Sequence, residues 1–255
     1  MTGPPPAPSR WAAAAFGRYL DRLLRGTFST VRWRRLDEPA PWPADVPVLA
    51  IANHTSWWDG FLSHQLTRAL GRSFRILMEA EHLGRYRVFR RVGALPLERR
   101  SARQAVRDLE VASQCLAEPG ATLWIYPQGM RRPAGEVPTR LEHGAAWLLG
   151  RHRGPLLVVP TAFRYPFLSE QRPEAFALIG SPWLLEGPVA ADRRAITARL
   201  AAMLVDTLAA LDADLAAERV AQYQVLVTGR GSINNRLDRV RHALGLLPDH
   251  QERNG

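Results

Sequence analysis

Residues 48–59 of the chain read VLAIANHTSWWD, a short apolar run that passes directly into a polar stretch. The run Val48–Ala52 lies between Pro47 and Asn53, as is typical of a buried β-strand. His54 and Asp59 follow it five positions apart, and on a regular helix this spacing places side chains about 140° apart. The two side chains can therefore meet only if the chain turns between them, as at the junction of a strand and a helix.

A histidine beside a carboxylate can act as a general base. The carboxylate holds one imidazole nitrogen and leaves the other free to take a proton from a hydroxyl group. No nucleophilic Ser in an elbow pattern accompanies His54, so the hydroxyl would belong to the substrate. The alternative that this pair alone leaves open is a structural histidine at the end of a strand.

The rest of the chain alternates between short apolar runs and amphipathic stretches, which predicts an α/β fold with helices on both faces of a sheet. Amphipathic helices are expected before this region, over Arg10–Val31, and after it, over Ala191–Ala221, with another helix near Asn235–Leu247. We expect a leader and helix over 1–34, an α/β core over 35–190 and a helical region over 191–255 packed on the core. The expected strands are 48–52, 74–78, 94–97, 122–126, 156–163 and 176–179, and the expected core helices are 60–70, 83–91, 102–117 and 141–149.

The charge balance of the chain is strongly basic. It has 34 basic residues, all of them Arg, against 24 acidic ones, and a net charge of +10 at pH 7. The guanidinium group of arginine can donate two hydrogen bonds at once to two oxygens of a phosphate or carboxylate. The surface should therefore attract polyanions such as nucleic acid, anionic lipid headgroups or phosphorylated substrates. The arginines are scattered and no nucleic-acid-binding motif is present, so we expect no nucleic-acid partner. The basic helix over Arg10–Val31 predicts either a helix in a membrane interface or one packed on its own domain.

Other classes of protein are disfavoured by what the sequence contains. Cys115 is the single cysteine, which excludes an intrachain disulfide and a Cys-rich metal site. No His/Cys/Asp cluster indicates a metal, so we expect none. No apolar run approaches the length of about 20 residues that a membrane-spanning helix needs, and we expect no secretory signal.

Four blocks, in order within residues 45–182, resemble the motifs of the glycerolipid acyltransferases, the 1-acylglycerol-3-phosphate (lysophosphatidic acid) acyltransferase family. Residues 53–59, NHTSWWD, resemble the first motif, Asn-His-x-Ser-x-x-Asp. Residues 93–99, GALPLER, resemble the second, Gly-x-Ile-Pro-Val-Asp-Arg, and residues 126–131, YPQGMR, resemble the third, Phe-Pro-Glu-Gly-Thr-Arg. Residues 158–160, VVP, resemble the fourth.

The resemblance implies a mixed sheet flanked by helices, and the transfer of a fatty acyl group from acyl-CoA or acyl-carrier protein to a lipid hydroxyl. It implies that His54 is the general base and that Asp59 orients it. It places Arg99 and Arg131 at an acceptor phosphate, and Gly129 where the backbone approaches closely. The chemistry needs no cofactor or metal. The substrate-binding residues implied are Asn53, Ser56, Gly93, Arg99, Gln128, Gly129 and Arg131.

The third motif departs from the family pattern, with Gln128 in place of Glu and Met130 in place of Thr. A Gln keeps the shape of Glu but loses its charge, which bears on the choice of acceptor. The expected acceptor is 1-acylglycerol-3-phosphate. The alternatives are the same chemistry on a non-phosphorylated acceptor such as a glycosylated lipid, or a non-catalytic protein that binds anionic lipids. Because such acceptors reside in bilayers, we expect a peripheral protein on the cytoplasmic, inner face of an anionic membrane.

Overall fold

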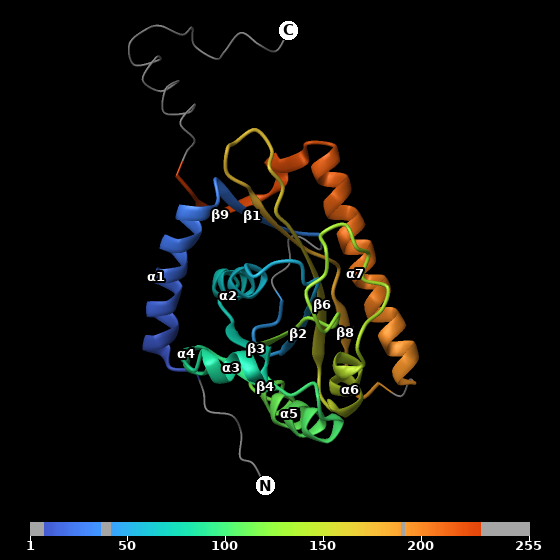
Figure 1. Cartoon of the computed structure of the whole chain (residues 1–255). Helices are drawn as coiled ribbons and strands as arrows, with labels where there is room; N and C mark the ends of the chain where they lie inside the picture. The colour runs from blue at the N-terminus through green and yellow to red at the C-terminus, as the bar shows by residue number, and fades with distance from the viewer. Residues whose placement is uncertain (1–7, 37–41, 190–191, 231–255) are drawn as a thin grey trace, which may run out of the picture.

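The computed structural model describes residues 8–36, 42–189 and 192–230 and confirms the mixed α/β architecture (Figure 1). The helices are α1 (Arg10–Thr27), α2 (Asp59–Ala69), α3 (Ala80–Arg85), α4 (Val88–Arg91), α5 (Ala102–Cys115), α6 (Gly144–Arg151), α7 (Arg193–Ala216) and the 3₁₀ helix η1 (Arg219–Gln222). The strands are β1 (Thr30–Arg35), β2 (Val48–Ala52), β3 (Ser73–Glu79), β4 (Ala94–Leu97), β5 (Ala121–Ile125), β6 (Leu156–Arg164), β7 (Ala175–Ile179), β8 (Trp183–Leu185) and β9 (Gln224–Thr228).

The strands of the described residues form one mixed sheet in the order β4-β3-β5-β2-β6-β7-β1-β9, with β8 paired to β6. The five strands from β4 to β6 are mutually parallel. Strand β7 runs antiparallel to β6, β1 is parallel to β7, and β9 is antiparallel to β1. The carboxyl ends of the five parallel strands therefore meet at one edge, here called the carboxyl edge, where open α/β sheets form their ligand sites.

Helices cover both faces of the sheet. Strand β2 illustrates the reason for this. All five of its side chains are apolar, and they alternate between two cores, each of which must be covered by helices. Leu49 and Ile51 lie in the core that α5, α6 and α7 cover, whereas Val48, Ala50 and Ala52 lie in the core that α1 and α2 cover. Figure 1 shows α1 and α2 on one side of the sheet and α7 on the other.

The N-terminal helix α1 packs on its own domain. Leu20 and Leu24 are fully buried, and the Asp21 carboxylate accepts hydrogen bonds from Gln65 Nε2 at 2.6 Å and Arg68 Nη1 at 3.0 Å of α2. The apolar side of α1 is therefore occupied by protein, which is the second of the two arrangements that its sequence predicted. No helix in the described ranges is long and apolar enough to cross a bilayer.

Several predictions of helices and strands were wrong. The helix predicted over Arg10–Val31 ends at Thr27, and Val31 lies in strand β1 opposite Ala175. Strands β1, β8 and β9 were not predicted. Strand β1 is Arg-rich and β8 has three residues, so each becomes a strand only through pairing with a distant partner. Strand β9, QVLVT, follows directly on the long stretch predicted to be helical. The single helix predicted over 83–91 is divided into α3 and α4. The helix predicted near 235–247 lies outside the described residues, and the predicted domain boundaries stay predictions.

Candidate active site

The carboxyl edge gathers residues of the first three motifs and Tyr165, which are far apart in the sequence. His54 follows β2, Arg99 follows β4, and Gln128 and Gly129 follow β5. Tyr165 is the first residue after β6. Because these strands are parallel and adjacent or nearly so, the folding of the sheet alone brings the segments to one place.

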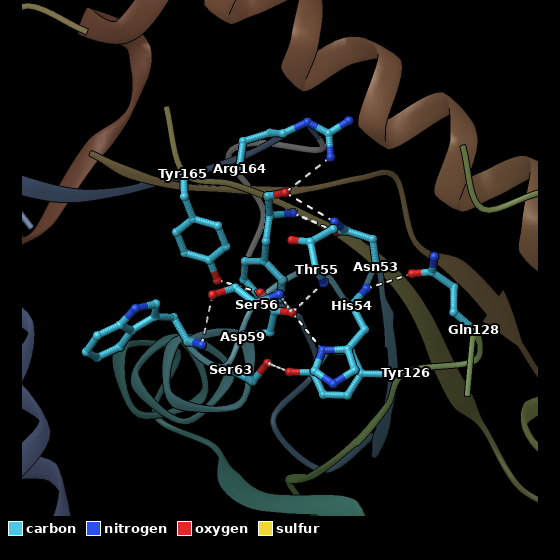
Figure 2. Close-up of polar contacts among 12 residues, drawn as sticks. Asn53, His54, Thr55, Ser56, Asp59, Ser63, Tyr126, Gln128, Arg164 and Tyr165 are labelled. Atoms are coloured by element: carbon cyan, nitrogen blue, oxygen red, sulfur yellow. Dashed lines mark hydrogen bonds and ion pairs between the residues drawn. The ribbon is translucent and has the colours of Figure 1, made fainter. Parts of the chain in front are cut away.

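His54 and Asp59 meet through the predicted turn between strand and helix. His54 Nδ1 lies 2.7 Å from Asp59 Oδ2 (Figure 2), and Asp59 is the first residue of α2. Asp59 is fully buried, whereas the His54 side chain is 25% exposed. An ionised carboxylate only accepts hydrogen bonds, so Nδ1 carries the proton and Nε2 presents a lone pair. This is the arrangement that a general base requires.

The negative charge of the buried Asp59 carboxylate is compensated by several hydrogen-bond donors. Its Oδ2 also accepts the backbone N–H groups of Thr55 at 2.8 Å and Ser56 at 2.9 Å, and its Oδ1 accepts the Tyr165 hydroxyl at 2.5 Å. The positive end of the α2 dipole adds to this compensation. A buried charge needs such partners, because desolvation alone would cost several kcal/mol. The carboxylate is thus held in a single orientation against His54.

Two tyrosines complete the surroundings of the pair. Burial, with the Asp59 charge, holds the pKa of the Tyr165 hydroxyl well above its usual value, so this hydroxyl stays protonated and donates a hydrogen bond to Asp59. The Tyr126 ring stacks on the His54 ring at a centroid distance of 4.5 Å, and its hydroxyl lies 2.8 Å from Ser63 Oγ. Burial and the Asp59 charge also raise the pKa of Tyr126 well above its usual value. Tyr126 is therefore a neutral group, and its ring holds the plane of the His54 imidazole.

Gln128 connects the third motif to the first. Its Oε1 accepts a hydrogen bond of 2.7 Å from the backbone N–H of His54, and the His54 carbonyl oxygen accepts one of 2.8 Å from the backbone N–H of Arg132. Gln128 is 6% exposed. The oxygen of its side chain thus supports the histidine backbone, a role that the oxygen of a Glu would fill equally well.

Asn53 and Ser56, which were expected to bind substrate, have other contacts in the structure. Asn53 is 1% exposed, and its amide group bonds both the N–H of Phe163, at 2.7 Å, and the C=O of Phe163, at 3.2 Å. Ser56 Oγ accepts the backbone N–H of Trp58 at 3.2 Å, at the start of α2. These side chains hold the loop that carries His54.

Gly93 lies at the amino end of β4, away from the carboxyl edge. Its φ is +110°, and a Cβ placed there would come within 2.2 Å of the Phe74 carbonyl oxygen. The glycine at this position is explained by its close approach to β3 rather than by contact with a substrate.

Arg99 and Arg131 lie on the exposed side of the site. Neither forms an ion pair with a carboxylate of the residues described here. The Arg99 guanidinium lies against Gly129, with Nη2 3.0 Å from where a Cβ of Gly129 would be. Gly129 has a φ of +73°, so both its conformation and this neighbour favour glycine. Arg99 therefore lies next to the third motif, and unpaired guanidinium groups such as these can bind an anionic group.

Sequence reasoning did not select Ser63, Tyr126 and Tyr165 as site residues. Tyr126 opens the third motif, and Tyr165 directly follows an apolar strand, which is a signal that could have found it. Ser63 has no such signal, because its position on α2 matters only through Tyr126. Within the described residues, no cluster of three His, Cys, Asp or Glu side chains could hold a metal ion.

The fold and the site define an α/β protein with a histidine–carboxylate pair at the carboxyl edge of a parallel sheet segment. The model of the family described as Acyltransferase matches residues 35–164, which include all of the motifs from His54 to Arg131. The chain belongs to this Acyltransferase family, and its class of activity is acyl transfer. A search of curated proteins found no match to the sequence.

Proposed function

We propose that the protein transfers a fatty acyl group from an acyl thioester, acyl-CoA or acyl-carrier protein, to the hydroxyl group of 1-acylglycerol-3-phosphate. The observation that carries the proposal is the His54–Asp59 pair, held at 2.7 Å at the carboxyl edge, where the exposed, unpaired Arg99 follows strand β4 and lies against Gly129. Membership of the Acyltransferase family supports the reaction class.

In the proposed reaction, His54 Nε2 takes the proton of the acceptor hydroxyl as that oxygen attacks the thioester carbonyl carbon. The C–S bond then breaks, and the imidazolium returns the proton to the leaving thiolate. The products are an ester and a free thiol, so His54 is regenerated. Asp59 stays ionised throughout and stabilises the imidazolium through its bond to Nδ1. No step requires a metal or an organic cofactor.

The two arginines support a phosphorylated acceptor. Arg99 and Arg131 have no carboxylate partner among the residues that the structure describes, and guanidinium groups bind phosphate oxygens in pairs. The contact between Gln128 and the His54 backbone supports Gln as a stand-in for Glu, because the same bond persists with either residue. Both observations favour retention of the phosphate site.

The second candidate is the same reaction on a non-phosphorylated acceptor, such as a glycosylated lipid. The neutral amide of Gln128 favours it, because the site has one negative charge fewer than a site with Glu. In either case we propose a peripheral location on the cytoplasmic face of an anionic membrane, where the lipid acceptor resides.

The test is an assay of labelled acyl-CoA and acyl-carrier protein with a panel of lipid acceptors. Wild-type protein should form an ester with 1-acylglycerol-3-phosphate, and H54A should reduce turnover by about 10²- to 10⁴-fold. H152A, at a half-buried histidine just before the amino end of β6 and therefore away from the carboxyl edge, is the matched control and should keep normal turnover. Ester formation only on a glycosylated lipid would favour the second candidate. Lipid binding without any turnover would indicate a non-catalytic protein.

Arg99 gives a test of the phosphate site. R99A should raise the KM for the phosphorylated acceptor by about 10- to 100-fold, the scale of a lost charge-assisted hydrogen bond, and leave the KM for the thioester unchanged. R107A, at an exposed arginine of α5, serves as the control. An unchanged acceptor KM in R99A would place Arg99 outside the acceptor site.

A further inference from the structure

Residues 85–91, RYRVFRR, form a basic corner that neither the fold nor the proposed reaction explains. Tyr86 and Val88 are 46% and 58% exposed. Four exposed arginines surround them, and none forms an ion pair with a carboxylate in the described part of the chain: Arg85, Arg87, Arg90 and Arg91. Exposed apolar groups beside unpaired cations mark an interaction surface.

The basic corner continues into a band of aromatic rings that leads to the active site. Tyr86 contacts Phe89 at 6.0 Å between ring centroids, Phe89 contacts Phe61 at 6.3 Å, and Phe61 contacts Trp57 at 4.4 Å. Trp57 is 56% exposed and is only three residues from His54. This aromatic band therefore connects the arginines of the corner to the loop that carries His54.

Helix α1 borders the same surface. Its N-terminal end lies beside α4, where the backbone N–H of Ser9 bonds the carbonyl oxygen of Arg91 at 3.1 Å (Figure 1). Phe16 contacts Phe61 and Phe89, and Tyr19 stacks on Phe16 with 57% exposure. Because the inward side of α1 is buried against α2, a partner can contact only its outward side.

We propose that the basic corner and the aromatic band dock the protein on the headgroup region of an anionic lipid bilayer. The proposal rests on the proposed function in one respect, namely that the acceptor is a lipid of that bilayer. Arginines are attracted to anionic headgroups, and amphipathic Tyr and Trp rings favour the membrane–water interface. Docking through this surface brings the loop that carries Trp57 and His54 toward the plane in which the acceptor lies.

The combination of groups favours a bilayer over the nucleotide phosphates of acyl-CoA. A nucleotide would need arginines aimed into a pocket, whereas these arginines are exposed and surround the half-exposed Tyr86 and Val88 on two short helices. An exposed surface that mixes cations with apolar groups fits a lipid headgroup layer.

The experiment measures flotation of the full chain with vesicles that contain equal amounts of phosphatidylglycerol and phosphatidylcholine, and with vesicles of phosphatidylcholine alone. The test variant is R87Q/R90Q/R91Q. The matched control is R103Q/R107Q/R194Q, which removes three exposed arginines from α5 and α7 on the other face of the sheet. A second test variant, Y86S/V88S, is compared with L184S/V225S, which alters two exposed apolar residues of β8 and β9.

We expect wild type to bind the anionic vesicles and R87Q/R90Q/R91Q to bind them about 100-fold more weakly, the scale expected for three basic residues near a membrane surface. The arginine control should remain near wild type, because charges far from the surface are screened beyond about 10 Å. Y86S/V88S should weaken binding and L184S/V225S should not. Equal loss in both arginine variants, or no loss in R87Q/R90Q/R91Q, would overturn the proposal. A raised KM for acyl-CoA with unchanged vesicle binding would also overturn it and assign the corner to the donor.

Failure of this proposal and failure of the proposed function are separable, because vesicle binding is measured without any reaction. If the proposed function holds, R87Q/R90Q/R91Q should keep normal turnover with a short-chain acceptor in free solution and lose rate only on acceptor in vesicles. Vesicle binding by a protein that transfers no acyl group would sustain the docking surface and refute the reaction.

Discussion

Asp59 has more hydrogen-bond partners than its role beside His54 alone would require. Its two oxygens accept bonds from the imidazole, from two backbone N–H groups and from the Tyr165 hydroxyl. Each donor removes part of the cost of burying the charge and restricts the rotation of the carboxylate. The orientation of His54 therefore depends on Tyr165, which lies more than 100 positions away in the sequence.

Tyr165 should act as a positioning residue. In Y165F the ring still stacks on Phe28, at 5.8 Å, but Asp59 Oδ1 loses its hydroxyl donor. We expect kcat to fall about tenfold, the scale of one hydrogen bond to a charged group, while the KM for the thioester stays unchanged. Steady-state kinetics with the active acceptor check this. Y19F removes an exposed hydroxyl on α1 and should have no effect; a kcat of wild-type size in Y165F would refute the role.

Gln128 gives a second prediction at this scale. Q128L should destabilise the protein by about 1–3 kcal/mol, because the buried N–H of His54 loses its acceptor. Q128E keeps an acceptor oxygen at the same place and should retain stability, which chemical denaturation of both variants measures. Transfer to 1-acylglycerol-3-phosphate should be kept or improved in Q128E if the acceptor is phosphorylated. A shift of Q128E away from a preferred neutral acceptor would instead support the second candidate function.

At the scale of elements, the junctions after the parallel strands determine the site. The β2–α2 junction turns the chain so that Asp59 faces back toward His54, and the β5 junction uses the positive φ of Gly129 to bring Gln128 under the His54 backbone. Strand β4 is positioned at its amino end rather than at its carboxyl end. There the backbone of Gly93 lies close to the backbone of β3, which fixes the register of the two strands.

The contact at Gly93 predicts a large loss of stability in G93A. A Cβ there would lie 2.2 Å from a backbone oxygen that cannot move without displacing β3, and the φ of +110° is unfavourable for alanine. We expect a loss of several kcal/mol, in the range reached by severe core substitutions. G84A in helix α3 is the control, because nothing lies within 4 Å of its added methyl group and it should raise stability slightly. Thermal unfolding of the two variants decides the matter, and similar melting temperatures would contradict the argument.

At the scale of the whole molecule, the packing of α1 on α2 buries a titratable group. His64 of α2 is 4% exposed, and its ring contacts Phe16 of α1 and Phe74 of β3 edge-on. Burial, assisted by the nearby Arg68 charge, lowers the pKa of His64 from its usual 6.5 to about 4. The histidine is therefore neutral in the folded protein across the physiological range.

This burial predicts that the protein loses stability in mild acid. Between pH 6.5 and about 4 the unfolded chain binds a proton at His64 that the folded chain excludes. The free energy of unfolding should thus fall as pH decreases through this window, by about 3 kcal/mol in all, and this contribution should be constant above pH 6.5. Urea unfolding at several pH values measures it, with H64L as the variant in which this part of the slope disappears. An equal slope in H64L would show that other groups cause the acid sensitivity.

The sequence alone was enough to predict the α/β class, most of the central strands and helices, and the meeting of His54 with Asp59. These features are local: an apolar run of five residues forms a strand, and a turn of six residues, 53–58, joins it to a helix. The resemblance of the motif blocks also implied that Arg99, Gln128 and Gly129 serve the same reaction, and the structure has all three follow strands that end at one edge.

The contacts of Tyr165 with Asp59 and of Gln128 with the His54 backbone were decided by the tertiary structure. So were strands β1 and β9 and the occupation of the apolar side of α1 by α2. Each of these joins segments that are 44 or more positions apart, and no local pattern specifies which distant partner a polar group or an Arg-rich strand will find. That choice is made when the whole sheet assembles and every buried donor and acceptor must be satisfied together.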